Sequence, residues 1–88
     1  MKASENIQVI KKDGRTEPFQ ASKIRGSLIY AGAKCEQAES ITKQVELSVV
    51  RSAKERKIST KQIRDKVIKL LREKNKEAAD AYEFYKKE

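Results

Sequence analysis

Residues 9–24 read VIKKDGRTEPFQASKI, and this stretch decides the fold. β-Branched residues stand before Asp13-Gly14, a dipeptide typical of hairpin turns because glycine readily takes the positive φ that a type I′ turn requires. Segment 15–19 is therefore predicted to be the returning strand, and Pro18 near its end suits an edge strand. An isolated hairpin is only marginally stable in water, so its apolar face must rest on other elements of the chain.

Four later segments carry apolar residues at helical spacing, and each predicts a helix. They are residues 22–30, residues 36–55, a segment that follows Ser59 and reaches Leu71, and residues 77–86. Residues 57–59 are able to pair as a short third strand. The predicted fold class is therefore α+β, a small four-helix bundle capped by a β-hairpin and a short third strand.

The start of the third predicted helix carries the clearest local signal. Ser59 is a good N-cap residue, and Gln62 stands three positions later, which completes a capping box. Ile58 before the cap and Ile63 four residues after it match the hydrophobic staple that often accompanies such a box. The sequence therefore predicts that Ser59 caps the start of this helix.

The composition excludes several classes of protein. The 88 residues include 21 Lys and Arg, 13 Asp and Glu and no His. One cysteine, Cys35, cannot form an intramolecular disulfide, and with a single cysteine and no histidine the chain lacks the several thiolate or imidazole ligands of zinc ribbons and zinc fingers. No run of about 18 apolar residues predicts a membrane span, and residues 1–6 lack the apolar core of a signal peptide. The free thiol and the missing export signal predict a cytoplasmic protein.

Positive charge is concentrated in the second half of the chain. Of the total net charge of +8, residues 1–50 carry +2 and residues 51–88 carry +6. Such an excess favours polyanionic partners, either nucleic acid or the phosphates of a nucleotide. A solvated, lysine-rich surface has the same composition, so charge alone leaves both interpretations open.

Catalytic chemistry is not expected. The chain has no histidine to act as a general base near neutral pH, and the spacing of its carboxylates does not pair them. Its glycines fit neither the G-x-x-x-x-G-K-[ST] nor the G-x-G-x-x-G phosphate-binding pattern. If phosphates bind here, side-chain cations must hold them. Candidates lie beside the hairpin and at the start of the third predicted helix: Lys11, Lys12, Lys23 and Arg64, with the hydroxyl of Thr60.

Three blocks of the chain resemble the ATP-cone domain. Residues 9–24 match approximately its opening pattern, V-x-K-[RK]-D-G-x-x-E-x-[FI]-[DN]-x-x-K-I. Residues 58–67, ISTKQIRDKV, are similar to the I-x-T-x-x-I segment at its third helix, and residues 81–87, AYEFYKK, look like its aromatic and basic final helix. The resemblance covers about residues 7–87, so residues 1–88 are expected to form a single ATP-cone-like domain with its core there.

The resemblance implies a regulatory nucleotide-binding module with no enzymatic activity. ATP cones occur at the N-terminus of ribonucleotide reductase large subunits and after a zinc ribbon in the bacterial repressor of reductase genes. They bind ATP or dATP, and occupancy changes quaternary structure. Mg²⁺ is expected to arrive on the triphosphate, without a metal site of the protein, because it commonly bridges phosphates and keeps several waters.

The family motif also implies roles for individual residues of this sequence. The side chains that match its phosphate-facing positions are Lys11, Lys12, Lys23, Thr60, Arg64 and Lys87. The residues expected to wall the adenine are Val9, Phe19 and Ile24. Glu17 is expected to accept a hydrogen bond from the adenine amino group. Gln20 is also expected at the nucleotide, at a position where the family usually has Asp or Asn, and glutamine caps a helix less well.

These expectations converge on a stand-alone ATP-cone-like domain that binds ATP or dATP without catalysis, as an allosteric sensor. The alternative is a small basic nucleic-acid-binding protein that uses its positive C-terminal half for phosphate contacts. A third possibility is an adaptor that keeps the fold without binding nucleotide. Besides the nucleotide, the expected partners are a second copy of the chain, in a homo-oligomer, or a protein regulated in trans. Nucleic acid ranks after them, and no membrane is expected.

Overall fold

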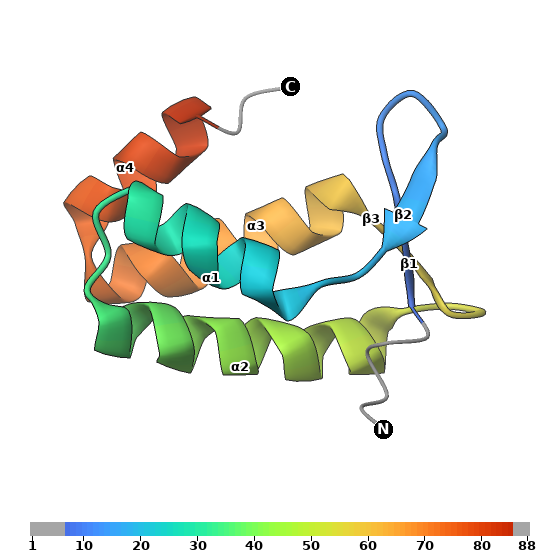
Figure 1. The fold of residues 1–88 in the computed structure, drawn as a ribbon, viewed down its shortest axis with the longest axis horizontal. Coiled ribbons are helices and arrows are strands. Elements are labelled where there is room, and N and C mark those ends of the chain that lie inside the picture. Colours follow the sequence, from blue (N-terminus) through green and yellow to red (C-terminus); the bar gives the residue numbers. More distant parts are fainter. Residues whose placement is uncertain (1–6, 86–88) are drawn as a thin grey trace.

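The computed structural model describes residues 7–85 of the chain. Within this range it contains three short strands and four helices (Figure 1). In chain order they are β1 (Gln8–Ile10), β2 (Thr16–Pro18), α1 (Ala21–Tyr30), α2 (Cys35–Ser52), β3 (Lys57–Ser59), α3 (Thr60–Lys74) and α4 (Lys76–Tyr85). The predicted α+β class, with four helices and a small three-stranded sheet, is confirmed.

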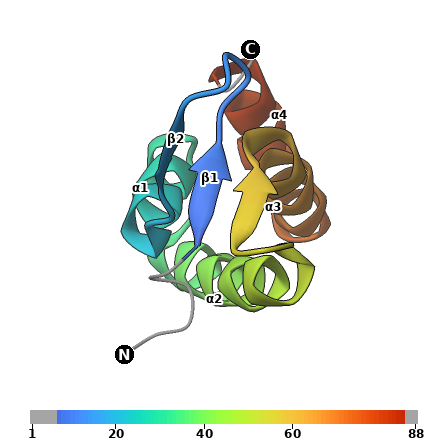
Figure 2. The same ribbon diagram turned by 90° about the vertical axis from the view of Figure 1, so that its right-hand side faces the viewer.

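The sheet has the strand order β2-β1-β3 and lies at one end of the helices (Figure 2). β1 pairs antiparallel with β2 and parallel with β3, so that Val9 stands beside Glu17 on one side and Ile58 on the other. Antiparallel neighbours need only a short loop, whereas parallel neighbours need a long crossover. Here α1 and α2 form that crossover, and α3 follows β3 directly.

The loop between β1 and β2 differs from the predicted two-residue type I′ turn. The Lys11 N–H donates to the Arg15 carbonyl at 2.7 Å, and the Gly14 N–H donates to the Lys11 carbonyl at 2.9 Å. Gly14 has a φ of +91°, whereas Asp13 does not have the positive φ that a type I′ turn also requires. Asp13 instead accepts the Arg15 N–H through its side chain, at 3.1 Å. The loop therefore has three residues and ends in a left-handed glycine.

The second helix ends earlier than its apolar pattern predicts. It stops at Ser52, and Lys54 and Lys57 then exchange both backbone hydrogen bonds at 3.0 Å. The two residues between them, Glu55 and Arg56, have φ values of +53° and +64°. Positive φ at both central positions is the mark of a type I′ turn, which here leads into β3.

The start of α3 is confirmed. The hydroxyl of Ser59 accepts the Gln62 backbone N–H at 3.2 Å, and the Gln62 side-chain oxygen accepts the Ser59 backbone N–H at 3.3 Å. Ile58 and Ile63, on either side of the cap, are both buried. The cap holds the junction between β3 and α3 in a fixed geometry, which matters because the next residue, Thr60, is a candidate site residue.

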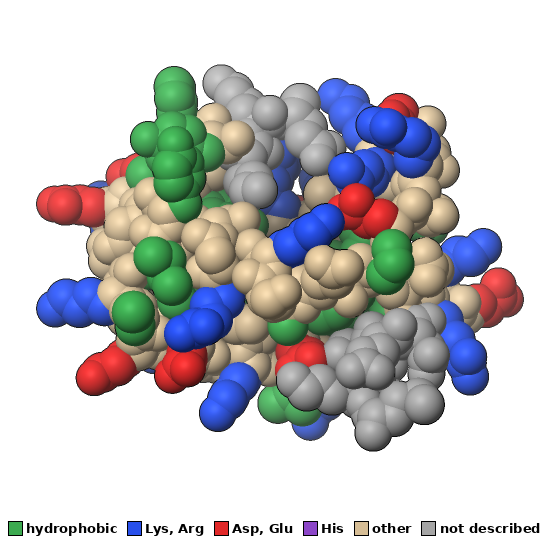
Figure 3. Space-filling view, viewed as in Figure 1, with side chains coloured by type: hydrophobic (Ala, Val, Ile, Leu, Met, Phe, Trp, Pro, Cys, Tyr) green, Lys and Arg blue, Asp and Glu red, His purple; other side chains and the backbone are tan. Residues whose placement is uncertain are grey.

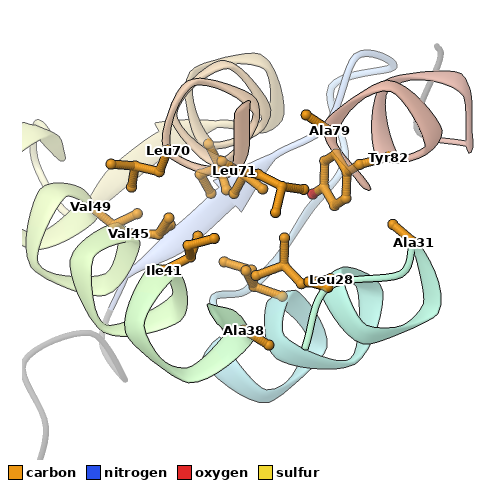
Figure 4. Packing of buried hydrophobic residues seen from close by; sticks show 14 of the residues in the cluster. Leu28, Ala31, Ala38, Ile41, Val45, Val49, Leu70, Leu71, Ala79 and Tyr82 are labelled. Carbon is orange, nitrogen blue, oxygen red and sulfur yellow. The ribbon is translucent and has the colours of Figure 1, made fainter. Parts of the chain in front are cut away.

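The core lies where the four helices meet (Figure 4). Leu28 from α1, Ile41 and Val45 from α2 and Leu71 from α3 are each 0% exposed, and Tyr82 from α4 closes the cluster. Each of these side chains comes from the apolar stripe of its helix, because residues three and four apart share one face. Because these apolar stripes pack against one another, the helices hold fixed positions, and the sheet rests against their ends.

Candidate functional site

A hollow of about 230 Å³ opens between the sheet and the helices α1, α3 and α4. Its floor is apolar: Val9 of β1, Phe19, Ile24 of α1 and Ile63 of α3 are all less than a tenth exposed. Its rim is polar and carries both signs of charge. The rim residues are Lys11, Glu17, Gln20, Lys23, Ser27, Thr60 and Arg64, and Pro18 and Tyr82 complete the wall.

A second hollow of about 280 Å³ adjoins the first and is more basic. Lys11, Thr60 and Arg64 line both hollows, so the two lie next to each other. The second is completed by Ile10, Lys12, Ser59 and Lys61. It therefore includes the first residues of α3, and the N-terminus of a helix favours anions through its unpaired N–H groups and the positive end of its dipole.

Most of the predicted site residues meet in the first hollow. These are Val9, Lys11, Glu17, Phe19, Gln20, Lys23, Ile24, Thr60 and Arg64. Lys12 lines only the second of the two hollows, whereas Lys11 lines both. The two lysines are consecutive residues directly after β1. Lys87 lies outside the described residues. The apolar members also belong to the hydrophobic core, so their burial has a structural cause as well.

Glu17 and Lys11 form an ion pair across the hairpin. The ammonium of Lys11 lies 3.3 Å from a carboxylate oxygen of Glu17, and both side chains are partly exposed. Val9 stands directly opposite Glu17, so Lys11 is the diagonal neighbour two residues along. The pair places the Glu17 carboxylate, a hydrogen-bond acceptor, at the rim above the apolar floor. A bound anion would compete with that carboxylate for the Lys11 ammonium.

Thr60 has a structural role that the sequence did not predict. Its hydroxyl donates to the carbonyl of Ile10 at 3.1 Å, which ties the first residue of α3 to the end of β1. While it donates there, the hydroxyl oxygen is available to a ligand only as an acceptor. Thr60 therefore fixes the shape of the rim between the two hollows.

Arg64 lines both hollows. Its side chain is 28% exposed, and its guanidinium lies 3.8 Å from the carboxylate of Asp65. It also faces Tyr82: burial raises the pKa of Tyr82 to about 12, and the positive charge of Arg64 lowers that pKa in part. The phenol of Tyr82 therefore stays protonated and neutral at neutral pH.

Four residues that line the first hollow were not predicted as site residues: Pro18, Ser27, Ile63 and Tyr82. Ser27 follows Lys23 by one helical turn, and its hydroxyl donates to the Lys23 carbonyl at 2.9 Å. The spacing of four residues from Lys23 could have placed Ser27 at the site from sequence alone, since residues four apart lie on one helix face. Tyr82 had a weaker signal, because its helical spacing is equally that of a core residue.

The described part of the chain offers no cluster of three or more His, Cys, Asp or Glu side chains that could hold a metal ion. None of the helices within residues 7–85 is both long and apolar enough to span a bilayer.

Comparison with known proteins identifies the fold. The family model described as the ATP cone domain matches residues 7–88, which is nearly the whole chain. No curated protein matches the sequence at a significant level. ATP cones are regulatory, non-catalytic modules that bind ATP or dATP. From the extent of the match, this chain belongs to the ATP-cone family.

Proposed function

We propose that this chain binds ATP or dATP across the two adjoining hollows and acts as an allosteric sensor without hydrolysing the nucleotide. The observation that carries the proposal is their adjacency: a hollow with an apolar floor and a basic hollow share Lys11, Thr60 and Arg64 as lining residues. A nucleotide is arranged in the same order, with a flat base at one end to fit the apolar floor and anionic phosphates at the other to fit the basic hollow. Each hollow alone is smaller than the roughly 300 Å³ at which ligand pockets usually begin, so a nucleotide would need both.

The base is assigned to the first hollow. Val9, Phe19 and Ile24 would supply its apolar contacts, and the Glu17 carboxylate is available to accept a hydrogen bond from the adenine amino group. A guanine would present a carbonyl oxygen at the corresponding edge, which repels a carboxylate. The proposed arrangement therefore favours adenine.

The phosphates are assigned to the second hollow and its rim. Lys11, Lys12 and Arg64 would supply charge-assisted contacts there, with Lys23 on the α1 side and Lys87 as a further candidate. Such contacts are stronger than neutral hydrogen bonds. Mg²⁺ would be held by the phosphates and water, since the described carboxylates form no cage for it.

The sensing role follows from the elements that the ligand would touch. The hollows are built by β1, α1 and α3, so a bound nucleotide would link segments that are far apart in sequence. At a ligand concentration of about 100 times Kd, binding stabilises the native state by about 2.7 kcal/mol. We expect this ordering to be transmitted to a second copy of the chain or to a protein regulated in trans.

Calorimetric titration with ATP and dATP in the presence of Mg²⁺, with light scattering of the same samples, tests the proposal. Saturable binding with a change in mass is the expected result. Lys11→Ala removes a charged contact and should weaken binding about 10- to 150-fold, from the value of about 1.5–3 kcal/mol for such hydrogen bonds. Lys43→Ala is the matched control, because Lys43 is an exposed lysine of α2 that lines neither hollow. No binding up to about millimolar nucleotide, or equal effects of the two substitutions, would refute it.

A further inference from the structure

The turn that connects α2 to β3 and its flanks carry five exposed cations. They are Arg51, Lys54, Arg56, Lys57 and Lys61, with Glu55 as the one acidic residue between them. We call these five side chains the basic turn surface. The end of α2, the strand β3 and the start of α3 all lie at the sheet end of the molecule (Figures 1 and 2). In Figure 3 lysine and arginine side chains lie over this end, most densely at the β1–β2 loop, and others lie at the opposite end of the molecule.

The cations of the basic turn surface differ from several arginines of the protein, and resemble exposed lysines such as Lys43 and Lys76, in making no ion pair among the described residues. Elsewhere Arg15 pairs with Asp13 at 2.6 Å, Arg25 lies 3.7 Å from Glu39, and Arg72 contacts two carboxylates at 2.9 and 3.3 Å. Among residues 7–85, none of the five makes an ion pair. Their charge is therefore available to a partner.

Local energetics at this turn are unfavourable in three ways. Lys54 and Lys57 stand directly opposite each other, and like charges at such positions destabilise a strand pair. Arg56 adopts a left-handed conformation, which costs a residue with a side chain about 1–2 kcal/mol. Lys61 lies in the first turn of α3, which has no acidic residue, so a positive charge faces the positive end of the helix dipole.

Backbone hydrogen bonds from Gln8 to Arg56 and between Lys54 and Lys57 hold the turn, but no described ion pair neutralises its lysines. Departures from local preference concentrate at functional sites. A polyanion would offset the electrostatic part of the cost here, because it neutralises the repulsion between Lys54 and Lys57 and the charge of Lys61 at once.

We propose that the basic turn surface binds the phosphate backbone of nucleic acid. Lysine is depleted at protein–protein interfaces, whereas protein–DNA interfaces are much more positively charged. No large hydrophobic residue is exposed within residues 51–61 to anchor a protein partner. Backbone phosphates carry no sequence information, so the binding is independent of sequence. This surface is separate from the apolar hollow, and only Lys61 also borders the basic hollow.

Fluorescence anisotropy with a labelled mixed-sequence duplex of roughly 20 base pairs tests the proposal, over about 50 to about 200 mM salt. Each phosphate contact contributes about −0.9 to the slope of log K against log salt, so five contacts predict a slope near −4.5. The double variant Lys54→Gln, Lys57→Gln loses two such contacts. The slope of log K against log salt should therefore become less negative by about 1.8, and duplex affinity should fall more than tenfold at about 100 mM salt.

The double variant also removes a like-charge pair, so its thermal stability should equal or exceed that of the parent chain. A loss of binding therefore cannot be attributed to unfolding. Lys43→Gln with Lys76→Gln is the matched control, because these exposed lysines lie outside the surface and the change in net charge is the same. Equal binding by the two double variants would overturn the proposal, and so would no binding by the parent chain.

An acidic protein is tested as the competing partner in the same assay. Unlabelled polyglutamate should displace the duplex less effectively than an unlabelled duplex of the same total charge. Equal competition would overturn the assignment to nucleic acid. The Lys54→Gln, Lys57→Gln variant should bind ATP with the same affinity as the parent chain, because neither lysine lines the hollows. A failure of this proposal is therefore distinguishable from a failure of the proposed nucleotide site.

Discussion

The turn at Glu55-Arg56 gives a stability prediction that depends only on backbone conformation. Arg56 has a φ of +64°, and its backbone carbonyl accepts the Gln8 N–H at 2.8 Å, so β1 holds the strained conformation in place. Arg56→Gly removes the cost of a left-handed residue, about 1–2 kcal/mol. Glycine loses more backbone entropy on folding, which destabilises the variant by about 0.5–1 kcal/mol. The difference spans about 0–1.5 kcal/mol, and we expect a net stabilisation near the middle of that range, about 0.5–1 kcal/mol.

Thermal unfolding followed by circular dichroism measures this effect. For a domain of this size 1 kcal/mol corresponds to about 4–8 °C, so the melting temperature should rise by about 2–8 °C. Arg56→Ala is the control, since alanine removes the same charge and side chain but keeps the penalty of a left-handed conformation. Its melting temperature should lie below that of Arg56→Gly. Equal melting temperatures of the two variants, or a destabilised glycine variant, would refute the argument from φ.

Three further predictions follow from single side chains. Ser59→Ala removes the cap of α3 and should lower the free energy of unfolding by about 1 kcal/mol, measured by urea denaturation. The pKa of Tyr82 is raised from 10.0 to about 12 in the folded chain, so its stabilising contribution is complete below pH 10 and is lost as the pH rises toward 12. Tyr82→Phe should abolish that part of the alkaline decline in melting temperature, and an unchanged decline would show that other groups cause it. Glu17→Gln should reduce the preference for ATP over GTP by about tenfold in calorimetric titrations, and an unchanged ratio would exclude Glu17 from base recognition.

Much of the fold could be predicted because short-range signals determine it. The capping box at Ser59 and Gln62 satisfies the first amides of α3 wherever that helix packs, and the structure contains it. Asp13-Gly14 correctly indicated a hairpin, but not the loop length. The Asp13 side chain accepts the Arg15 N–H and favours a three-residue loop, which a dipeptide pattern does not encode.

The end of α2 could not be predicted from the sequence because tertiary pairing overrides helix propensity there. Glu55 and Arg56 are good helix formers, yet both adopt positive φ so that β3 can turn back and pair in parallel with β1. The same limit applies to the candidate site. Tyr82 reaches the hollow only because α4 packs beside α1 and α3, and its own helix carries no sign of that.

The central proposal, a nucleotide that spans the two hollows, is tested most directly by titrating ATP into isotopically labelled protein and following backbone amide chemical shifts. The largest changes should fall on Val9, Lys11, Phe19, Lys23 and the first turn of α3, while amides in the middle of α2 stay unchanged. Saturating changes confined to the turn at residues 54–57, or no changes at all, would contradict the proposed site.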